Sequence, residues 1–493
     1  MNYLDIFHQL NHIPRPSHHE GPVADFLCQF AEDHGLKYRR DAQNCVVIAK
    51  PATPGYESAE PIVILNHMDM VCVAQDGYLR DGRPFNPLTD NIRSYVETDE
   101  NGTRWMKAEG TSLGADNGIG LSMALAILTD DSLVHPAIEV LTTTNEEDGM
   151  SGAEGLSNDF IHGRKVINLD SEAYNEITVG AAGACLQEGK WDLVFKPVPA
   201  GYAFKKILIS GGLGGHSGVD INKGRCNCNH ELFELIDQDL FDGNDELGPI
   251  YICHMKGGTA NASIASWAEA VVALPANSTD PLQGIVTEWD SQIKAKYEKT
   301  DPAISICLTD CEPMTHYIEN AYNIVSCIAH LPYGVQRMRP DMPGTVMTSN
   351  NIGMVSINGN GNTITVSCHT RSFDNAEQTR LSSTIRQMML NEQSTDVKML
   401  MNTGAWLERE DSPLLALTCR TFKDVLGFEP KKVAMHFVLE AAYYVEKYPG
   451  IEIASIGPLI IEPHSTSERV NLDTADNIWR VTVELLRRLA SCE

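Results

Sequence analysis

The order of apolar and polar residues predicts alternating helices and strands over the first 170 residues. Apolar residues recur at helical spacing in 4–13 and 22–35, where Gly35 is a candidate helix C-cap. A compact apolar run at 118–128, rich in Gly and Ala, predicts a buried helix. Runs rich in β-branched residues predict strands at 44–50, 61–71, 137–144 and 165–170. This alternation favours an α/β domain with a mostly parallel sheet.

The pattern changes from about residue 176 and changes back near residue 405. Alternating polar and apolar residues predict strands at 177–195, 204–210, 268–275, 304–310, 353–359 and 362–373. Amphipathic helices are expected at 226–241 and 378–393, and no internal repeat is evident. These elements suit an α+β domain whose antiparallel sheet has one solvated face. A helix at 412–427, a strand at 451–461 and a helix at 476–490 restore the α/β pattern.

This layout predicts an α/β domain interrupted by an inserted α+β domain. The chain has 493 residues, which is too long for one typical hydrophobic core. We expect the first part of the α/β domain at 1–186, the inserted domain at 187–400, and the second part of the α/β domain at 401–493.

Composition and charge narrow the possible partners. The chain has 38 basic and 66 acidic residues, a net charge of −28, which argues against nucleic acid and anionic membranes. No run reaches the roughly 18 apolar residues of a membrane span, and the first residues lack a signal-peptide pattern. The 13 cysteines are scattered and form no paired zinc framework. Reduced thiols in a cytoplasmic protein are the simplest interpretation.

Acidic and imidazole side chains recur where the predicted strands of the α/β domain end. In open α/β sheets, the carboxyl ends of the strands form the ligand crevice, so these side chains should gather at one edge. The residues are His67, Asp116, Glu146, Glu147, Asp170 and His464.

Each of these positions also has an ordinary structural interpretation. The acidic turn at 146–148 could be a solvated turn, and Asp116 could be the N-cap of the helix that follows it. Asp69 lies two residues beyond His67, so in a strand both side chains share a face. A carboxylate behind a histidine fixes its tautomer, as behind a metal ligand, but the two could also form a surface pair.

Taken together, the types and the number of these residues match what a dinuclear metal site requires. Two metals about 3.5–4 Å apart need a carboxylate between them and one or two private ligands each. Three carboxylates and two imidazoles meet this need and leave one carboxylate over. The remaining carboxylate would be a general base that takes a proton from a metal-bound water.

Six motifs in this order give the sequence a family resemblance. They are NHMDMV, TSLGADNGIGL, TTTNEEDGMSGA, INLDSE, GGHSGVDINKGR and IEPHSTSERV. The chain resembles the dinuclear zinc peptidases, which include carboxypeptidase G-type enzymes, carnosinases and bacterial dipeptidases. The resemblance covers essentially the whole chain, and it is the combination of motifs that makes it specific.

The resemblance implies a role for each residue of the set. It makes Asp116 the carboxylate that bridges two Zn²⁺ ions, and it implies a cis peptide between Asp116 and Asn117. His67 and Asp170 would complete one metal site, and Glu147 and His464 the other. Glu146 would be the general base, and Asp69 would orient His67. Mn²⁺ or Co²⁺ would also suit these nitrogen and oxygen ligands.

The resemblance also assigns the inserted domain and the partners. It implies a lid that also forms a homodimer, in which His216 reaches a neighbouring active site and polarises the scissile carbonyl. The alternative for His216 is a structural turn histidine. The implied substrate is a dipeptide, Xaa-His or of broad specificity, or another small peptide.

The chain departs from the family pattern in the lid. Asn261, Ala262, Ala265 and Ser266 stand where Arg, Asn, Pro and Arg are usual. At 436–443, Glu440 is kept but two glycines are replaced. These changes concern substrate binding and leave two alternatives open: a related deacylase of N-acyl amino acids, or a catalytically weak, metal-binding homologue.

Overall fold

The computed structural model describes residues 2–241, 247–407, 409 and 411–491. The chain divides into two compact units. Unit 1 comprises 1–180, 407–434 and 440–493, and unit 2 comprises 181–406 and 435–439. Each unit has its own hydrophobic core.

Unit 1 is built on an eight-stranded sheet. In spatial order its strands are β1 (Lys37–Arg40), β2 (Val46–Lys50), β8 (Ile138–Thr143), β3 (Ile62–His67), β9 (Lys165–Asn168), β23 (Glu452–Ser455), β10 (Glu176–Ala181) and β22 (Lys431–Met435). The central strands β8, β3, β9 and β23 run parallel. β2 and β10 pair antiparallel with the outer members of this group. The sheet is therefore mixed, with a parallel centre, where the sequence predicted a mostly parallel sheet.

The difference has a local cause at one edge. β2 is the second strand of a hairpin with β1, so it reverses direction before it pairs with β8. A hairpin needs only a short turn, whereas a parallel neighbour needs a crossover of a dozen or more residues.

Within the described residues, unit 1 contains seven helices. They are α1 (Tyr3–Leu10), α2 (Gly21–Asp33), α3 (Ala115–Thr129), α4 (Ser151–Gly155), α9 (Pro413–Leu426), α10 (Ala441–Lys447) and α11 (Leu472–Ser491). α1, α2, α3, α9 and α11 share one core with alternate residues of the sheet. α3 is apolar on all sides and buried, as its sequence predicted. α2 ends at Asp33, and Gly35 beyond it has φ +66°.

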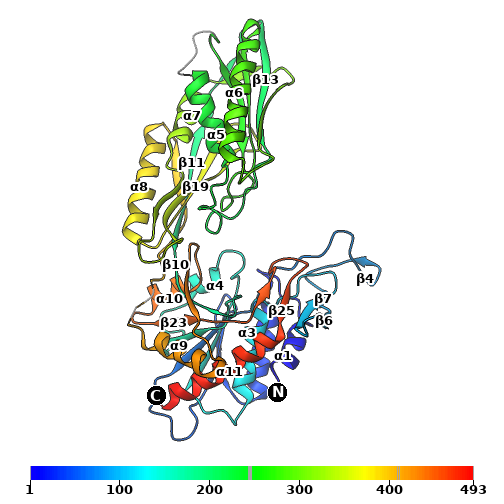
Figure 1. Cartoon of the computed structure of the whole chain (residues 1–493), viewed down its shortest axis with the longest axis vertical. Helices are drawn as coiled ribbons and strands as arrows, with labels where there is room; N and C mark the ends of the chain where they lie inside the picture. Colours follow the sequence, from blue (N-terminus) through cyan, green and yellow to red (C-terminus); the bar gives the residue numbers. More distant parts are fainter. Residues whose placement is uncertain (1, 242–246, 408, 410, 492–493) are drawn as a thin grey trace. The chain divides into compact units, whose positions relative to one another are not determined.

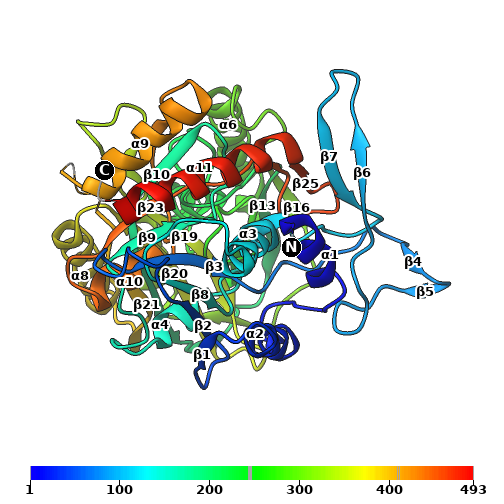
Figure 2. The ribbon, with the colours of Figure 1, turned by 90° about the horizontal axis from the view of Figure 1, so that it is seen from below.

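Smaller strands extend unit 1 beside this core. One four-stranded sheet has the order β24 (Ile460–Ile461), β25 (Arg469–Asn471), β7 (Arg104–Ala108) and β6 (Ser94–Thr98). A further hairpin joins β4 (Leu79–Arg80) and β5 (Arg83–Pro84), and Figure 2 shows it and the β6–β7 hairpin projecting from the helices of unit 1. The predicted strand 451–461 is split into β23 and β24, because the segment around Gly457 packs against the backbone of Ser171.

Unit 2 contains a nine-stranded sheet whose described strand pairs are all antiparallel. Its order is β16 (Ser305–Asp310), β13 (Tyr202–Ser210), β15 (Ala268–Pro275), β14 (Tyr251–Gly257), β19 (Val346–Ile357), β20 (Thr363–Ser372), β11 (Gly183–Asp192) and β21 (Asp396–Thr403), with β18 (Gly334–Met338) beside β19. β12 (Phe195–Pro197) and β17 (His316–Ile318) form a separate pair. The predicted strand 177–195 is divided between the two units, as β10 and β11.

Helices pack against this second sheet (Figure 1). They are α5 (Cys228–Leu235), a π-helical turn at Ile236–Phe241, a short 3₁₀ turn at Ala276–Ser278, α6 (Thr279–Tyr297), α7 (Ala321–His330) and α8 (Asn375–Asn391). Among the described residues, none of the helices combines the length and the apolar character needed to cross a bilayer.

One arrangement of strands and helices occurs twice in unit 2, although the sequence shows no evident repeat. β13, α5, β14, β15, α6 and β16 follow one another in the chain, and their sheet order is fourth, first, third, second strand. β11, α7, β19, β20, α8 and β21 have the same element order and the same strand order. The two copies meet where β14 pairs with β19. Architecture is thus repeated where residue identity is not.

Candidate metal centre

Three parallel strands bring the predicted ligands of unit 1 to one edge of the sheet. β8 and β3 run parallel with His67 opposite Thr143, and β9 lies on the other side of β3. Glu146 and Glu147 follow the end of β8, and Asp170 follows the end of β9. The carboxyl ends of adjacent parallel strands meet at the same edge, so the side chains converge.

Asp116 reaches this edge from the start of α3. The Asp116–Asn117 peptide is cis, as the resemblance implied. The helix N-cap is Gly114, and neither Asp116 nor Asn117 has helical dihedral angles. The two oxygens of Asp116 do not cap the helix but face imidazole rings, which excludes the alternative of an ordinary N-cap.

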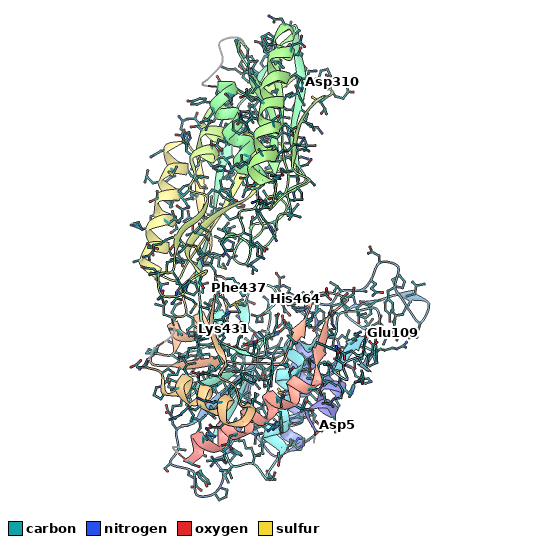
Figure 3. All side chains as sticks on the ribbon, in the orientation of Figure 1. Asp5, Glu109, Asp310, Lys431, Phe437 and His464 are labelled. Atoms are coloured by element: carbon teal, nitrogen blue, oxygen red, sulfur yellow. The ribbon has the colours of Figure 1, made fainter. Side chains whose placement is uncertain are left out.

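Asp116 lies between two histidines. Its Oδ1 is 3.0 Å from Nε2 of His67, and its Oδ2 is 3.1 Å from Nε2 of His464. His464 belongs to the segment between β24 and β25 and is labelled in Figure 3. One carboxylate therefore faces a different nitrogen donor with each oxygen, which is the arrangement that a bridging ligand requires.

Each histidine also contacts a second carboxylate. Nε2 of His67 is 3.2 Å from Oδ1 of Asp170, and Nε2 of His464 is 2.7 Å from Oε2 of Glu147. His67, Asp116 and Glu147 each place one ligand atom within 4.8 Å of the others. The structure thus brings together all five predicted metal ligands as two sets that share Asp116.

The electrostatics of the cluster reflect its density of charge. Hydrogen bonds to Asp116 and Glu147 raise the pKa of His464 to about 11. Burial opposes protonation of His67, but the neighbouring carboxylates outweigh it and raise the pKa of this imidazole. Burial, together with nearby carboxylates, raises the pKa of Glu146, Glu147 and Asp170. Carboxylates that are hard to ionise without a counter-charge are suited to a bound cation.

The donor atoms fit such a cation. Oε1 of Glu147 is buried without a hydrogen-bond partner among the described residues. Nε2 of both histidines and the oxygens of three carboxylates converge, and imidazole and carboxylate are the ligands of Zn²⁺ and similar ions. A divalent ion would satisfy the unpaired oxygen and offset the negative charge.

Asp69 has a different main contact from the one expected. Nδ1 of His67 lies 3.1 Å from the backbone carbonyl of Asp69 and 3.6 Å from its Oδ1. The Asp69 carboxylate accepts the backbone N–H groups of Glu146 and Glu147 at 3.1 and 3.2 Å. Asp69 is fully buried, so the surface-pair alternative is wrong.

A further buried carboxylate lies close to the predicted base. Glu440 accepts hydrogen bonds from the hydroxyl groups of Thr143, at 3.0 Å, and Tyr444, at 3.3 Å. Burial raises the pKa of Glu440 to about 8. Glu440 also contributes to the raised pKa of Glu146. The sequence showed that Glu440 was retained but gave it no role.

Two residues to which the sequence analysis gave no role hold the backbone of this edge. Glu468 accepts the N–H groups of Leu113, Gly114 and Ala115 at 2.7–2.9 Å. Arg15, on the other side, donates to the carbonyl of Gly114. The proline-flanked IPRPS sequence and the last glutamate of IEPHSTSER were the only signals, and neither reveals a partner far away in the chain.

His216, the remaining predicted site residue, belongs to unit 2. Nε2 of His216 lies 3.4 Å from a guanidinium nitrogen of Arg371, which also contacts Ser217 and His369. Arg371 is 3% exposed, and among the described residues no carboxylate pairs with it. Burial and the Arg371 charge lower the pKa of His216 to about 4. A buried, unpaired guanidinium beside neutral imidazoles is suited to bind an anion.

The segment 261–266, which departs from the family pattern, lies beside this cluster. The carbonyl of Ala262 accepts the N–H of Ser217 at 2.8 Å, and Ser263 forms an isolated bridge with His216. The changes at 261–266 are therefore adjacent to the residues that contact Arg371.

Unit 2 contains another cluster of acidic and imidazole side chains, which differs from the candidate metal centre of unit 1. His230, Glu231 and Glu234 of α5 have ligand atoms within 4.8 Å of one another. Glu231, however, already pairs with Lys296 at 2.7 Å and accepts the hydroxyl of Tyr297 at 2.6 Å. Its charge is compensated by the protein itself.

Comparison with known proteins identifies the class to which this fold and site belong. The chain belongs to Peptidase family M20/M25/M40, whose sequence profile matches residues 63–488. The resemblance noted in the sequence is thereby confirmed.

Individual relatives match over nearly the whole length. The chain is 31% identical to the cytosol non-specific dipeptidase of Escherichia coli (strain K12), over 98% of this chain and 97% of that protein. The crystal structure of aminoacylhistidine dipeptidase from Vibrio alginolyticus matches with a TM-score of 0.84 and 30% identity, over 98% and 96% of the two chains. Aminopeptidase PepT from Bacillus cereus shares the fold, with a TM-score of 0.55 and 15% identity over 99% and 98%.

Proposed function

We propose that the protein is a metal-dependent dipeptidase with a dinuclear centre in unit 1. The observation that carries the proposal is the position of Asp116, which faces His67 with one oxygen and His464 with the other. The family supports a peptidase, and the relative that is 31% identical is a dipeptidase.

The proposed ligand sets follow the contacts. His67 and Asp170 would hold one ion, Glu147 and His464 the other, and Asp116 both. When bound, two divalent ions supply Lewis acidity and stabilise developing negative charge. We propose that both ions are Zn²⁺. Mn²⁺ or Co²⁺ would suit the same donor atoms.

Glu146 is the proposed general base. Its pKa is raised by burial and by neighbouring carboxylates, so it holds a proton more readily than an ordinary glutamate. In the proposed reaction, Glu146 takes a proton from the attacking water and passes it to the leaving amine. Asp69 fixes the backbone of Glu146, which restricts where this carboxylate can reach.

We assign the anion-binding role in unit 2 to Arg371. A dipeptide has a terminal carboxylate, and a buried guanidinium without a carboxylate partner is the matching cation. Unit 2 would be the lid, and His216 would polarise the scissile carbonyl. As the resemblance implies, we propose a homodimer through unit 2 in which His216 serves the partner's site. A cytoplasmic location is proposed on the name of the Escherichia coli relative.

The changed lid residues keep a second candidate open. Asn261, Ala262 and Ser266 replace charged or amide groups that bind substrate in the family, and they lie next to Ser217 and His216. A deacylase of N-acyl amino acids would use the same centre and the same carboxylate-binding arginine. A catalytically weak homologue would retain the ligands but not the turnover.

The test separates these three functions. The protein is stripped of metal, reconstituted with Zn²⁺, Mn²⁺ or Co²⁺, and assayed on a dipeptide panel that includes Xaa-His and on N-acyl amino acids. We expect two ions per chain and hydrolysis of dipeptides. Hydrolysis of N-acyl amino acids alone would support the deacylase, and metal binding without turnover of either group would support the weak homologue.

A further inference from the structure

One short N-terminal segment contacts all the loops that carry the metal ligands of β3, β8 and α3. We infer that Arg15, Ser17 and Glu20, here called the N-terminal bracket, position the metal centre. The inference rests on the proposed metal site, but it concerns residues that bind no ion themselves. The bracket lies before residues 63–488, the region that matches the family.

Arg15 joins the loop after β3 to the loop before α3. One guanidinium nitrogen donates to the carbonyls of Met68 and Asp69 at 3.1 and 3.2 Å, and the other donates to Gly114 at 2.6 Å. These carbonyls lie within two residues of His67 and Asp116. The rigid planar fork of an arginine fixes the separation of the two loops, which a flexible side chain would not.

Arg15 is costly to bury, which argues for a specific role. It is 1% exposed, and among the described residues no carboxylate forms an ion pair with it. A buried charge without a direct partner is destabilising compared with an apolar side chain of similar size. Gly114 and Gly118 leave the space that the guanidinium fills, since a Cβ on either would lie 2.6 Å from its terminal nitrogen.

Ser17 and Glu20 hold the third loop. The hydroxyl of Ser17 donates to Oδ2 of Asp69 at 2.8 Å, and Asp69 in turn binds the backbone of Glu146 and Glu147. Glu20, 5% exposed, accepts the N–H of Asn145 at 2.9 Å. The loop after β8 is thus attached to Glu20 directly, and to Ser17 through the carboxylate of Asp69.

Glu468 completes the arrangement around Gly114 from the opposite side. It accepts the Gly114 N–H at 2.9 Å, while Arg15 takes the Gly114 carbonyl. Gly114 precedes Asp116 by two residues. Because the backbone of Gly114 is held in place, it fixes the position from which the side chain of Asp116 extends. Loosening of the bracket should shift ligands relative to one another without removing any of them.

The experiment measures metal affinity by competition with a chromogenic chelator, together with urea unfolding of the metal-free protein. Arg15→Met removes the charge and the three hydrogen bonds but keeps the length of the side chain. We expect it to weaken metal binding by about 10–100-fold, as loss of other outer-shell partners does. Arg80→Met is the matched control, because Arg80 is a buried arginine of unit 1 that donates to Asn91 and pairs with Asp81, neither of which is a candidate ligand.

The control separates positioning from general destabilisation. Arg80→Met should lower the urea midpoint and leave metal affinity at the wild-type value. Equal metal affinity in wild type and Arg15→Met, or an equal loss in Arg15→Met and Arg80→Met, would overturn the inference. If the wild type itself binds no metal, the proposed function fails instead.

Milder variants keep the test decisive if Arg15→Met does not fold. Ser17→Ala removes the hydrogen bond to Asp69, and Glu20→Met removes the acceptor of the Asn145 N–H. We expect each to weaken metal binding by at least a few-fold and to lower kcat at limiting metal. Excess metal should restore part of that kcat. Wild-type metal affinity and kcat in both variants would show that the bracket is a structural connection only.

Discussion

The carboxylate of Asp69 accepts the backbone N–H of Glu146 through Oδ1, over a distance of 3.1 Å. Oδ2 accepts the N–H of Glu147 at 3.2 Å, so one buried side chain fixes two successive peptides at the end of β8. Glu146 and Glu147 lie in the turn that follows β8, and both backbone N–H groups are fixed by this one carboxylate. The fixed turn is consistent with separate proposed roles for the neighbouring glutamates, one as base and one as metal ligand.

Glu146→Gln should abolish most hydrolysis and keep both metals. The amide is nearly isosteric with the carboxylate but cannot accept the proton of the attacking water. Loss of a general base typically costs about 10²–10⁴-fold in rate. Steady-state assays and metal analysis check this. Asp148→Asn is the control in the same turn, since the Asp148 side chain is exposed and pairs with His18. Wild-type turnover in Glu146→Gln would assign the proton transfer elsewhere.

Asp116→Ala should lose metal, because it removes a donor from both proposed ions at once. Metal analysis after gel filtration should find fewer than one ion per chain. Asp301→Ala is a suitable control, since Asp301 is also buried but lies in unit 2, where it accepts the N–H groups of Leu213 and Cys226. Two retained ions in Asp116→Ala would refute the bridging role.

The convergence of the candidate metal ligands could be predicted from sequence because it follows from strand order. His67, Glu147 and Asp170 each follow a run of apolar β-branched residues, and parallel neighbours must bring such positions to one edge. The pairing of β3 with both β8 and β9 then makes the convergence specific. Hydrophobic pattern and motif spacing were sufficient for this part of the site.

The supporting contacts could not be predicted in the same way. Arg15 meets Gly114 across 99 positions of sequence, and Glu468 meets Leu113 across 355. A hydrogen bond to a backbone carbonyl or N–H does not depend on the side chain of the partner residue. The partner therefore cannot be recognised from its residue type. The duplicated topology of unit 2 was hidden for a related reason, since many sequences satisfy the same alternation of strands and helices.

Unit 2 should lose stability as the pH falls below about 6.5, in part through His436. This imidazole is 7% exposed, contacts Ser349 at 2.8 Å, and has its pKa lowered to about 3 by burial and by the charge of Arg371. The native state therefore holds the neutral form. Its stabilisation is complete above the unfolded pKa of about 6.5 and is lost as the pH falls towards 3.

His436 should contribute about 1.4 kcal/mol per pH unit to the slope of the free energy of unfolding against pH, through the range from pH 6 to pH 4. Urea unfolding at several pH values should show a slope that is shallower by this amount in His436→Gln. Identical slopes in the two proteins would contradict a buried, neutral His436.

Mixing two inactive variants tests whether His216 serves the partner's site. Glu146→Gln and His216→Ala are each expected to be nearly inactive. In a two-fold dimer with shared sites, a mixed dimer has one intact site, so random re-pairing restores about a quarter of the sites. Activity of the mixture after exchange, compared with each variant alone, is the measurement. A mixed dimer demonstrated by light scattering but without recovered activity would show that His216 acts within its own chain.

The last prediction concerns the cation that holds the substrate's carboxylate. Lys256 pairs with Glu269 at 3.3 Å, and Arg225 pairs with Asp220 at 3.4 Å. Arg371 has no carboxylate partner among the described residues, and the altered loop offers only neutral groups at Asn261 and Ser266.

Arg371→Met should therefore reduce kcat/KM for a free-acid dipeptide such as β-Ala-His. A hydrogen bond to a charged group contributes about 1.5–3 kcal/mol, which is roughly 10–100-fold. The C-terminal amide of the same dipeptide should lose much less, because it carries no charge for the guanidinium to bind. Lys256→Met is the control, and it should change kcat/KM little and by the same factor for both substrates. Asn261→Arg should instead lower KM for the free acid, since it adds a cation to the segment that contacts Ser217 and His216. Equal losses on acid and amide in Arg371→Met, with no gain in Asn261→Arg, would show that Arg371 supports the fold of unit 2 and that the carboxylate is bound by other groups.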